Sequence, residues 1–151
     1  NFSHAVMIHG DNQYDVRYIT ALYKKIKKTK VDAVTGSRMI KLKDALSGKM
    51  PIYKLIGNFV LTNIFNFVYK SKFTDAHSGL WIYKISSIKD INFKKFDNNY
   101  NFDNQLRIKF VNSKKKILEI PIKTYYRNEE SSFHVIYSIK FLIEVFKKFI
   151  K

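Results

Sequence analysis

The stretch Ala5-Val6-Met7-Ile8-His9-Gly10-Asp11-Asn12-Gln13 decides the fold that we expect for this chain. A short apolar run, typical of a strand, ends in a turn that carries a carboxylate and two amides. Open α/β sheets bind their ligands at the carboxyl ends of strands, so Asp11 lies where a site is expected. A carboxylate beside a glycine that permits close approach suits a divalent metal carrying phosphate. An ordinary polar turn explains the same residues equally well.

The pattern of apolar residues along the rest of the chain predicts an α/β fold. Helical spacing over residues 16–28, followed by a strand over 32–38, forms a strand-helix-strand unit and favours a parallel sheet. We expect one domain with a mixed, mostly parallel sheet flanked by helices. The further predicted segments are a mobile loop over 41–50, helices over 52–69, 102–111 and 133–150, and strands over 80–83 and 116–122.

The composition indicates a folded, strongly basic protein. The chain has 151 residues, 46% of them hydrophobic and 16% aromatic, which are globular values. Its formal net charge of +16 implies attraction to nucleic acid, anionic lipid or nucleotide. The codon bias of an A/T-rich genome also favours lysine, and the lysines are spread along the chain rather than gathered on one arm. No cysteine is present, which excludes disulfides and thiolate metal sites.

Two of the predicted helices have amphipathic patterns with two explanations each. In residues 52–69 a narrow polar stripe of Lys54, Asn58, Thr62 and Asn66 crosses an otherwise apolar helix, which favours burial over contact with a membrane. In residues 133–150 lysines share one face opposite a broad apolar face, as in an interfacial helix or a helix packed on its own domain.

Several polar side chains at predicted strand ends and helix starts are candidates for chemistry. His9 is a second metal ligand or a histidine hydrogen-bonded at a strand end, and Gln13 reaches a phosphate or sugar hydroxyl or is a solvated turn amide. Arg38 clamps a phosphate or forms a salt bridge. Asp103 is a general base or a helix cap.

Two further candidates have weaker support. His77, in the turn before the strand over 80–83, contacts an acceptor phosphate or is structural. Arg127, after two tyrosines, binds a phosphate or is merely exposed.

Taken in order, these motifs resemble the family-2 glycosyltransferases of GT-A fold, especially the branch that uses dolichyl or polyprenyl phosphate as acceptor for mannose or glucose. Each motif is weak alone, but five occur in the family's order over nearly the whole chain. The motifs are Val6-Met7-Ile8-His9-Gly10-Asp11-Asn12-Gln13-Tyr14, Gly36-Ser37-Arg38, Asp75-Ala76-His77-Ser78-Gly79-Leu80, Phe102-Asp103-Asn104-Gln105 and Glu119-Ile120-Pro121-Ile122.

The resemblance implies roles for individual residues. Asp11 is the last acid of the family's DxD motif and holds Mg²⁺ or Mn²⁺ on the diphosphate, while His9 replaces the first acid. Arg38 matches an arginine near the phosphates, and Lys54 a basic residue that meets the acceptor phosphate. Asp103 falls where many of these enzymes keep their catalytic base.

The resemblance also implies an inverting transfer from a nucleotide-sugar to an acceptor, which in the branch named above is a polyprenyl phosphate, by an enzyme peripheral to the cytoplasmic face of a membrane. It covers roughly the later two-thirds of the family's catalytic domain. We therefore expect a fragment that lacks the N-terminal strands, with an exposed sheet edge. The alternative is a non-enzymatic basic module that binds nucleic acid or anionic membrane.

Overall fold

The computed structural model describes residues 2–99, 101–126 and 135–149. Four strands form one mixed sheet in the order β1-β3-β2-β4. They span His4–Ile8 (β1), Ala33–Ser37 (β2), Leu80–Lys84 (β3) and Ile117–Pro121 (β4). The α-helices span Tyr18–Lys28 (α1), Leu42–Ser47 (α2), Ile52–Tyr69 (α3), Ile85–Ile88 (α4), Phe102–Asn112 (α5) and Val135–Phe146 (α6), with 3₁₀ turns at Phe93–Lys95 and Lys147–Phe149.

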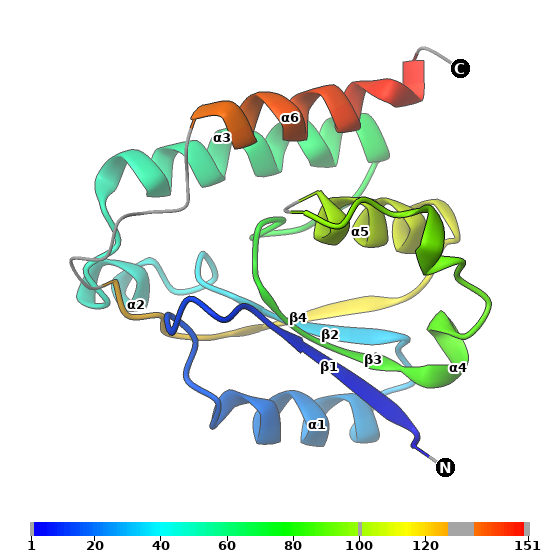
Figure 1. The fold of residues 1–151 in the computed structure, drawn as a ribbon. Helices are drawn as coiled ribbons and strands as arrows, with labels where there is room; N and C mark the ends of the chain where they lie inside the picture. The colour runs from blue at the N-terminus through cyan, green and yellow to red at the C-terminus, as the bar shows by residue number, and fades with distance from the viewer. Residues whose placement is uncertain (1, 100, 127–134, 150–151) are drawn as a thin grey trace.

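Helices cover both faces of the sheet (Figure 1). Helix α1 lies on one face, and α3, α5 and α6 lie on the other, with α3 and α6 side by side. The α/β class that the sequence predicts is confirmed.

Alternating side chains of the strands fill a separate core on each face. On β3, Trp81 and Tyr83 point toward α3, α5 and α6, whereas Leu80 and Ile82 point toward α1. This two-residue alternation is the normal geometry of a strand covered on both faces. Helix α1 completes its core with Leu22 and Ile26, and its lysines face away from the sheet.

The expectation of a mostly parallel sheet is wrong for the pairing of neighbours. Strands β1, β2 and β4 run in one direction, but β3 lies between β1 and β2 and is antiparallel to both. Only β2 and β4 pair in parallel. Strands β1 and β2, which α1 connects, are not neighbours in the sheet, and β3 lies between them. The continuous apolar sequence of β3 suits this central position because both of its faces are buried.

The predicted mobile loop over 41–50 is also wrong, because this segment contains α2 and packs closely. Ala45 is fully buried, and the carbonyl of Gly48 accepts a 2.8 Å hydrogen bond from the amide of Tyr126. A Cβ atom on Gly48 would lie 1.9 Å from the carbonyl oxygen of Thr124. Glycine therefore allows the segment to touch the chain that follows β4.

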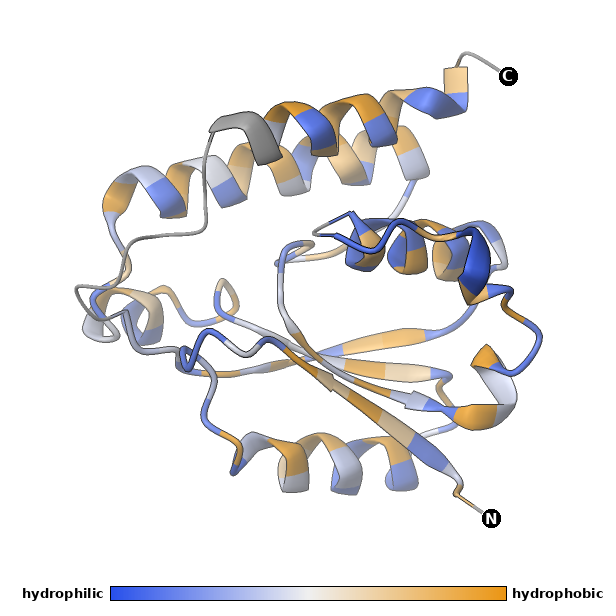
Figure 2. Cartoon of the chain, in the orientation of Figure 1, coloured by the Kyte–Doolittle hydropathy of each residue, from blue (hydrophilic) through white to orange (hydrophobic). Residues whose placement is uncertain are grey.

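Helix α3 has its predicted bounds but not its predicted burial. Asn58 and Thr62 of the polar stripe are buried, while apolar side chains of the other face lie in solvent, including Phe67 at 83% exposure. Apolar residues recur along both α3 and α6 (Figure 2). The stripe faces inward because its amides and hydroxyl hold the segment over residues 73–77, as described below. Within the described part of the chain, no helix is long and apolar enough to cross a membrane.

Candidate functional site

The turn after β1 is held in place by backbone contacts on both sides. The amide of His9 donates to the carbonyl of Gly79 at 3.0 Å, and the carbonyl of Gln13 accepts from the amide of Tyr125 at 3.0 Å. Asp11 accepts a 3.2 Å hydrogen bond from the amide of Gln13, which is the bond of an Asx turn. Asn12 has φ of 56°, a left-handed conformation that asparagine tolerates. The polar turn predicted from the sequence is therefore present, with Asp11 part of its structure.

A cavity of about 680 Å³ opens beside this turn and brings together candidates from distant parts of the chain. Every predicted site residue that the structure describes lines it: His9, Asp11, Gln13, Arg38, Lys54, His77 and Asp103. Arg127 lies outside the described residues. Among the described residues, the lining includes the cations Lys54, Arg107 and Lys140 and two carboxylates, Asp11 and Asp103. Its charge therefore favours an anionic ligand.

His9 and Asp103 form a hydrogen-bonded pair across the cavity wall. Nε2 of His9 contacts Oδ2 of Asp103, although the residues are 94 positions apart in the chain. The other side of the ring packs on Gly79, where a Cβ atom would lie 2.2 Å from Nδ1. Asp103 makes this contact from the first turn of α5 and does not cap the helix, because no side chain caps that helix start. This hydrogen bond orients the carboxylate of Asp103 and occupies Nε2 of His9.

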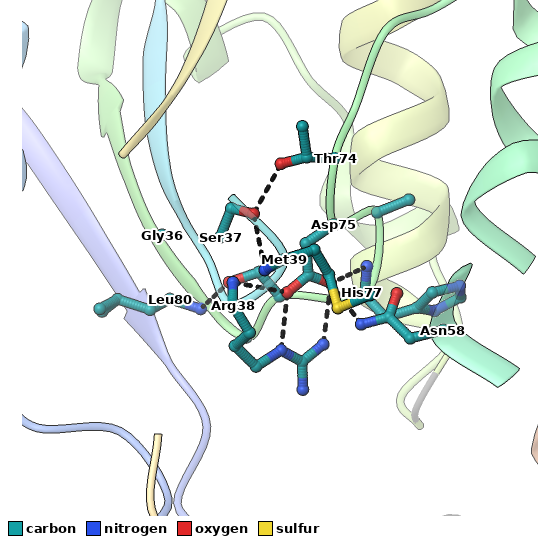
Figure 3. A network of polar contacts seen from close by, with 12 residues as sticks. Gly36, Ser37, Arg38, Met39, Asn58, Thr74, Asp75, His77 and Leu80 are labelled. Carbon is teal, nitrogen blue, oxygen red and sulfur yellow. Dashed lines mark hydrogen bonds and ion pairs between the residues drawn. The ribbon is translucent and has the colours of Figure 1, made fainter. Parts of the chain in front are cut away.

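Arg38 and Asp75 form a buried ion pair at the end of β2 (Figure 3). Nε and Nη2 of Arg38 donate to the two oxygens of Asp75 at 2.6 and 2.8 Å, a bidentate geometry. Burial opposes ionisation of Asp75, but the adjacent guanidinium outweighs it and holds the pKa of this carboxyl well below its usual range. The third nitrogen, Nη1, donates to the hydroxyl of Tyr126 at 3.0 Å. Any phosphate contact by Arg38 therefore involves the Nη1 side of the guanidinium.

The polar stripe of α3 anchors the segment that carries Asp75 and His77. Asn58 donates from Nδ2 to Asp75 at 2.9 Å, Thr62 accepts from the amide of Ala76 at 3.1 Å, and Asn66 bonds both backbone groups of Phe73. From the other side, Glu119 of β4 accepts from the amides of Thr74 and Asp75. The segment is thus fixed by a helix and a strand together.

Lys54 and His77 line the cavity, and the pKa of each is below its ordinary value. Burial, and then the charge of Arg38, lower the pKa of Lys54, whose Nζ lies 5.1 Å from the ring centroid of Tyr126. Burial, and then the charge of Arg107, lower the pKa of His77 to about 3. His77 is therefore a neutral imidazole at physiological pH, and its buried Nε2 has no hydrogen-bond partner within the part of the chain described.

Of the two described carboxylates in the cavity lining, Asp103 bonds to His9, whereas Asp11 forms no hydrogen bond or ion pair with another described side chain and is the candidate metal ligand. Residues 2–99, 101–126 and 135–149 contain no group of three or more His, Asp or Glu side chains able to hold a metal ion. Mg²⁺ is commonly bound by one or two carboxylates together with substrate phosphates and water. Asp11, half-buried at the cavity wall, fits this arrangement as the single protein carboxylate for a metal that arrives with a diphosphate.

Comparison of the chain with protein-family models gives no match, and comparison with curated proteins gives none either. The resemblance to family-2 glycosyltransferases therefore rests on the sequence motifs alone and stays a prediction.

Sequence reasoning missed Arg107, which lines the cavity one helical turn after Asp103. The spacing could have revealed it, since residues i and i+4 share one face of a helix. The same rule applies to Asn58, four residues after Lys54 on α3. The bidentate role of Asp75 had no local signal, because its partner Arg38 is 37 residues away.

Proposed function

We propose that this chain carries the acceptor-side and metal-binding part of an inverting, metal-dependent glycosyltransferase of the GT-A type. The observation that carries the proposal is the single cavity lined by all the described candidates, which come from β1, β2, α3, β3 and α5 or from the turns beside them. Their types suit a nucleotide-sugar: a carboxylate for a metal on the diphosphate, cations for phosphate, and a second carboxylate for the attacking group.

In the proposed reaction an acceptor oxygen attacks the anomeric carbon while the nucleoside diphosphate leaves from the opposite side. Asp11 would hold the metal ion, which would supply charge stabilisation to the diphosphate. Lys54 binds a phosphate, and its partly buried position strengthens that attraction. The main contribution of the site is orientation and charge stabilisation.

Asp103 is the proposed base for a hydroxyl acceptor, and His9 orients it. The hydrogen bond with His9 and the packing of that ring on Gly79 support a fixed carboxylate. With an acceptor that is already an anion, such as a polyprenyl phosphate, deprotonation is not needed and Asp103 acts in positioning only.

The outer faces of α3 and α6 support a membrane-surface substrate. Large apolar side chains are exposed on both helices, among them Ile52, Ile56, Phe59 and Phe67 on α3 and Ile139 and Ile143 on α6. Exposed apolar area of this kind marks an interaction surface, and a lipid-borne acceptor would bring it against the bilayer. The same two helices also contribute to the cavity, which Lys54 of α3 and Lys140 of α6 line.

The test is a transfer assay with the protein expressed from its complete reading frame, Mn²⁺, a panel of nucleotide-sugars and a polyprenyl phosphate. We expect transfer that chelation abolishes and that Asp11→Asn lowers at least about tenfold, equivalent to about 1.4 kcal/mol. The matched control is Asp15→Asn, because Asp15 belongs to the same turn region but pairs with the exposed Arg17 and does not line the cavity. Metal-dependent transfer that survives intact in Asp11→Asn would contradict the site.

A binding experiment with the same protein distinguishes the proposed glycosyltransferase from a basic nucleic-acid-binding module. That alternative predicts salt-dependent binding to duplex DNA with no response to Mn²⁺ or nucleoside diphosphate. The four lysines Lys24, Lys25, Lys27 and Lys28 lie on α1, on the face of the sheet opposite α3 and α6. Replacing these lysines with neutral residues should weaken binding to duplex DNA if the protein is a nucleic-acid-binding module. It should not change the binding of a nucleoside diphosphate if the protein is a glycosyltransferase.

A further inference from the structure

Arg107 is a buried cation that forms no ion pair with any described residue. It lies on α5 with 3% exposure and lines the cavity. Nη1 donates to Oδ1 of Asn104 at 2.8 Å. Within the described ranges, the buried Nε has no hydrogen-bond partner, and no hydrogen bond joins Nη2 to another residue. The open edge of this guanidinium is therefore the one formed by Nε and Nη2.

The surroundings of Arg107 hold the side chain without neutralising it. Its Cζ lies 5.7 Å from the ring centroid of Trp81 and 6.0 Å from that of Phe65, which are cation–π distances. The negative charge of Asp103 acts on Arg107 from a distance, but the Asp103 carboxylate bonds to His9 and makes no hydrogen bond or ion pair with Arg107. A buried charge without a hydrogen-bonded counter-ion is costly, and an anion that reaches it recovers much of that cost.

Arg38 identifies the ligand chemistry within the same chain. It uses the same two nitrogens, Nε and Nη2, to hold the carboxylate of Asp75. Its remaining nitrogen, Nη1, bonds a neutral oxygen, as Nη1 of Arg107 also does. A planar fork of this kind binds carboxylates and phosphates with two parallel hydrogen bonds.

We propose that Arg107, which shares the cavity lining with His77, forms a subsite for a compact oxyanion on the sugar that is transferred, a carboxylate or a phosphate. The assignment to the sugar rests on the proposed function. Under that function Asp11 and Lys54 take the diphosphate and the acceptor, and Arg107 lies on the face of α5 that presents Asp103 to the reacting carbon. The oxyanion subsite itself requires neither metal nor nucleotide.

Trp81 is the only tryptophan of the chain and lies against Arg107, so its fluorescence reports on the subsite. We would titrate the protein with glucuronate, glucose 6-phosphate and glucose at constant ionic strength, without metal or nucleotide. The variants are Arg107→Gln, Arg107→Lys and the control Arg17→Gln, whose arginine is exposed and pairs with Asp15. Circular dichroism and thermal melting check that each variant is folded.

We expect one or both acidic sugars to bind saturably and glucose not to bind. Arg107→Gln should weaken that binding roughly tenfold to a hundredfold, since a charge-assisted bidentate contact is lost, and Arg17→Gln should not change it. Arg107→Lys should restore part of the affinity because it keeps the charge but not the fork. Preference for glucuronate or for glucose 6-phosphate tells which oxyanion is recognised.

The proposal is overturned if neither acidic sugar binds, or if both bind Arg107→Gln as tightly as the wild type. Should Arg107→Gln fail to fold, the comparison of Arg107→Lys with wild type decides, and equal affinity of the two overturns a fork-specific site. Failure of the glycosyltransferase proposal would look different, because it would remove the response to Mn²⁺ and nucleoside diphosphate and leave the metal-free sugar-acid titration unchanged.

Discussion

The two buried arginines of the cavity, Arg38 and Arg107, differ in where their counter-charge comes from. Arg38 faces Asp75, and the pair is completed by Asn58 and by backbone amides, so five hydrogen bonds reach one carboxylate. Arg107, as far as the structure describes its neighbours, donates one hydrogen bond, to Asn104, and lies near the rings of Trp81 and Phe65. The first arrangement stabilises the fold by itself. The second is incomplete within the described residues and is suited to an incoming anion.

The largest effect should come from removing the paired arginine. Arg38→Met leaves the carboxylate of Asp75 buried without its counter-ion, which costs about 3–5 kcal/mol in buried pairs. Chemical denaturation monitored by circular dichroism measures the free energy of unfolding. Adding Asp75→Asn to this variant should restore part of the loss, because the isolated charge is then gone. A loss below about 1 kcal/mol, the range of exposed pairs, would mean that the two arginines are not different in kind.

A smaller effect is expected from the neutral histidine beside Arg107. The pKa of His77 is about 3 in the folded chain, below its ordinary value of 6.5, so at pH 5 the unfolded state binds a proton that the folded state does not. Stability should therefore fall as the pH drops below about 6.5, by roughly 1.4 kcal/mol per pH unit, or roughly 2 kcal/mol at pH 5. His77→Gln should flatten the stability profile between pH 7 and 5. An unchanged slope in this variant would disprove the buried neutral state.

The smallest effect on stability should come from removing the unpaired arginine. Arg107→Met gives up cation–π contacts and one hydrogen bond but also relieves an uncompensated buried charge. These contributions oppose each other, and the free energy of unfolding should stay within about 1 kcal/mol of wild type or rise above it. Denaturation under the conditions used for Arg38→Met gives the direct contrast. A loss as large as that of Arg38→Met would end the distinction between the two residues.

Removal of Arg107 should also change the ionisation of His77. The charge of Arg107 is the second cause, after burial, of the lowered pKa of His77. In Arg107→Met that pKa should rise toward its ordinary value while the pKa of the more distant His4 does not change. NMR titration of the histidine ring protons measures both in one sample.

The sequence was most reliable where local patterns decide structure. The bounds of α3, α5 and β4 follow from the pattern of apolar residues along the chain, and the structure agrees with them within a residue or two. The candidates around the cavity were found because strand ends and helix starts expose polar side chains at the same edge of a sheet.

Long-range packing accounts for what the sequence could not reveal. The antiparallel insertion of β3 between β1 and β2 depends on which strands meet, and strand pairing leaves little trace in a local pattern. The inward direction of the polar stripe on α3 depends on Asp75 and Ala76, which follow in a later segment. The outward apolar face of α3 then contradicts the expectation that apolar residues are buried.

The most direct test of the account is calorimetric titration of the protein with a nucleoside diphosphate in the presence and absence of Mn²⁺. If the cavity at the end of β1 is a metal-diphosphate site, binding should need the metal, and Asp11→Asn should weaken it at least about tenfold while Asp15→Asn does not. Equal affinity with and without Mn²⁺, or in wild type and Asp11→Asn, would contradict the assignment of this cavity to a nucleotide-sugar.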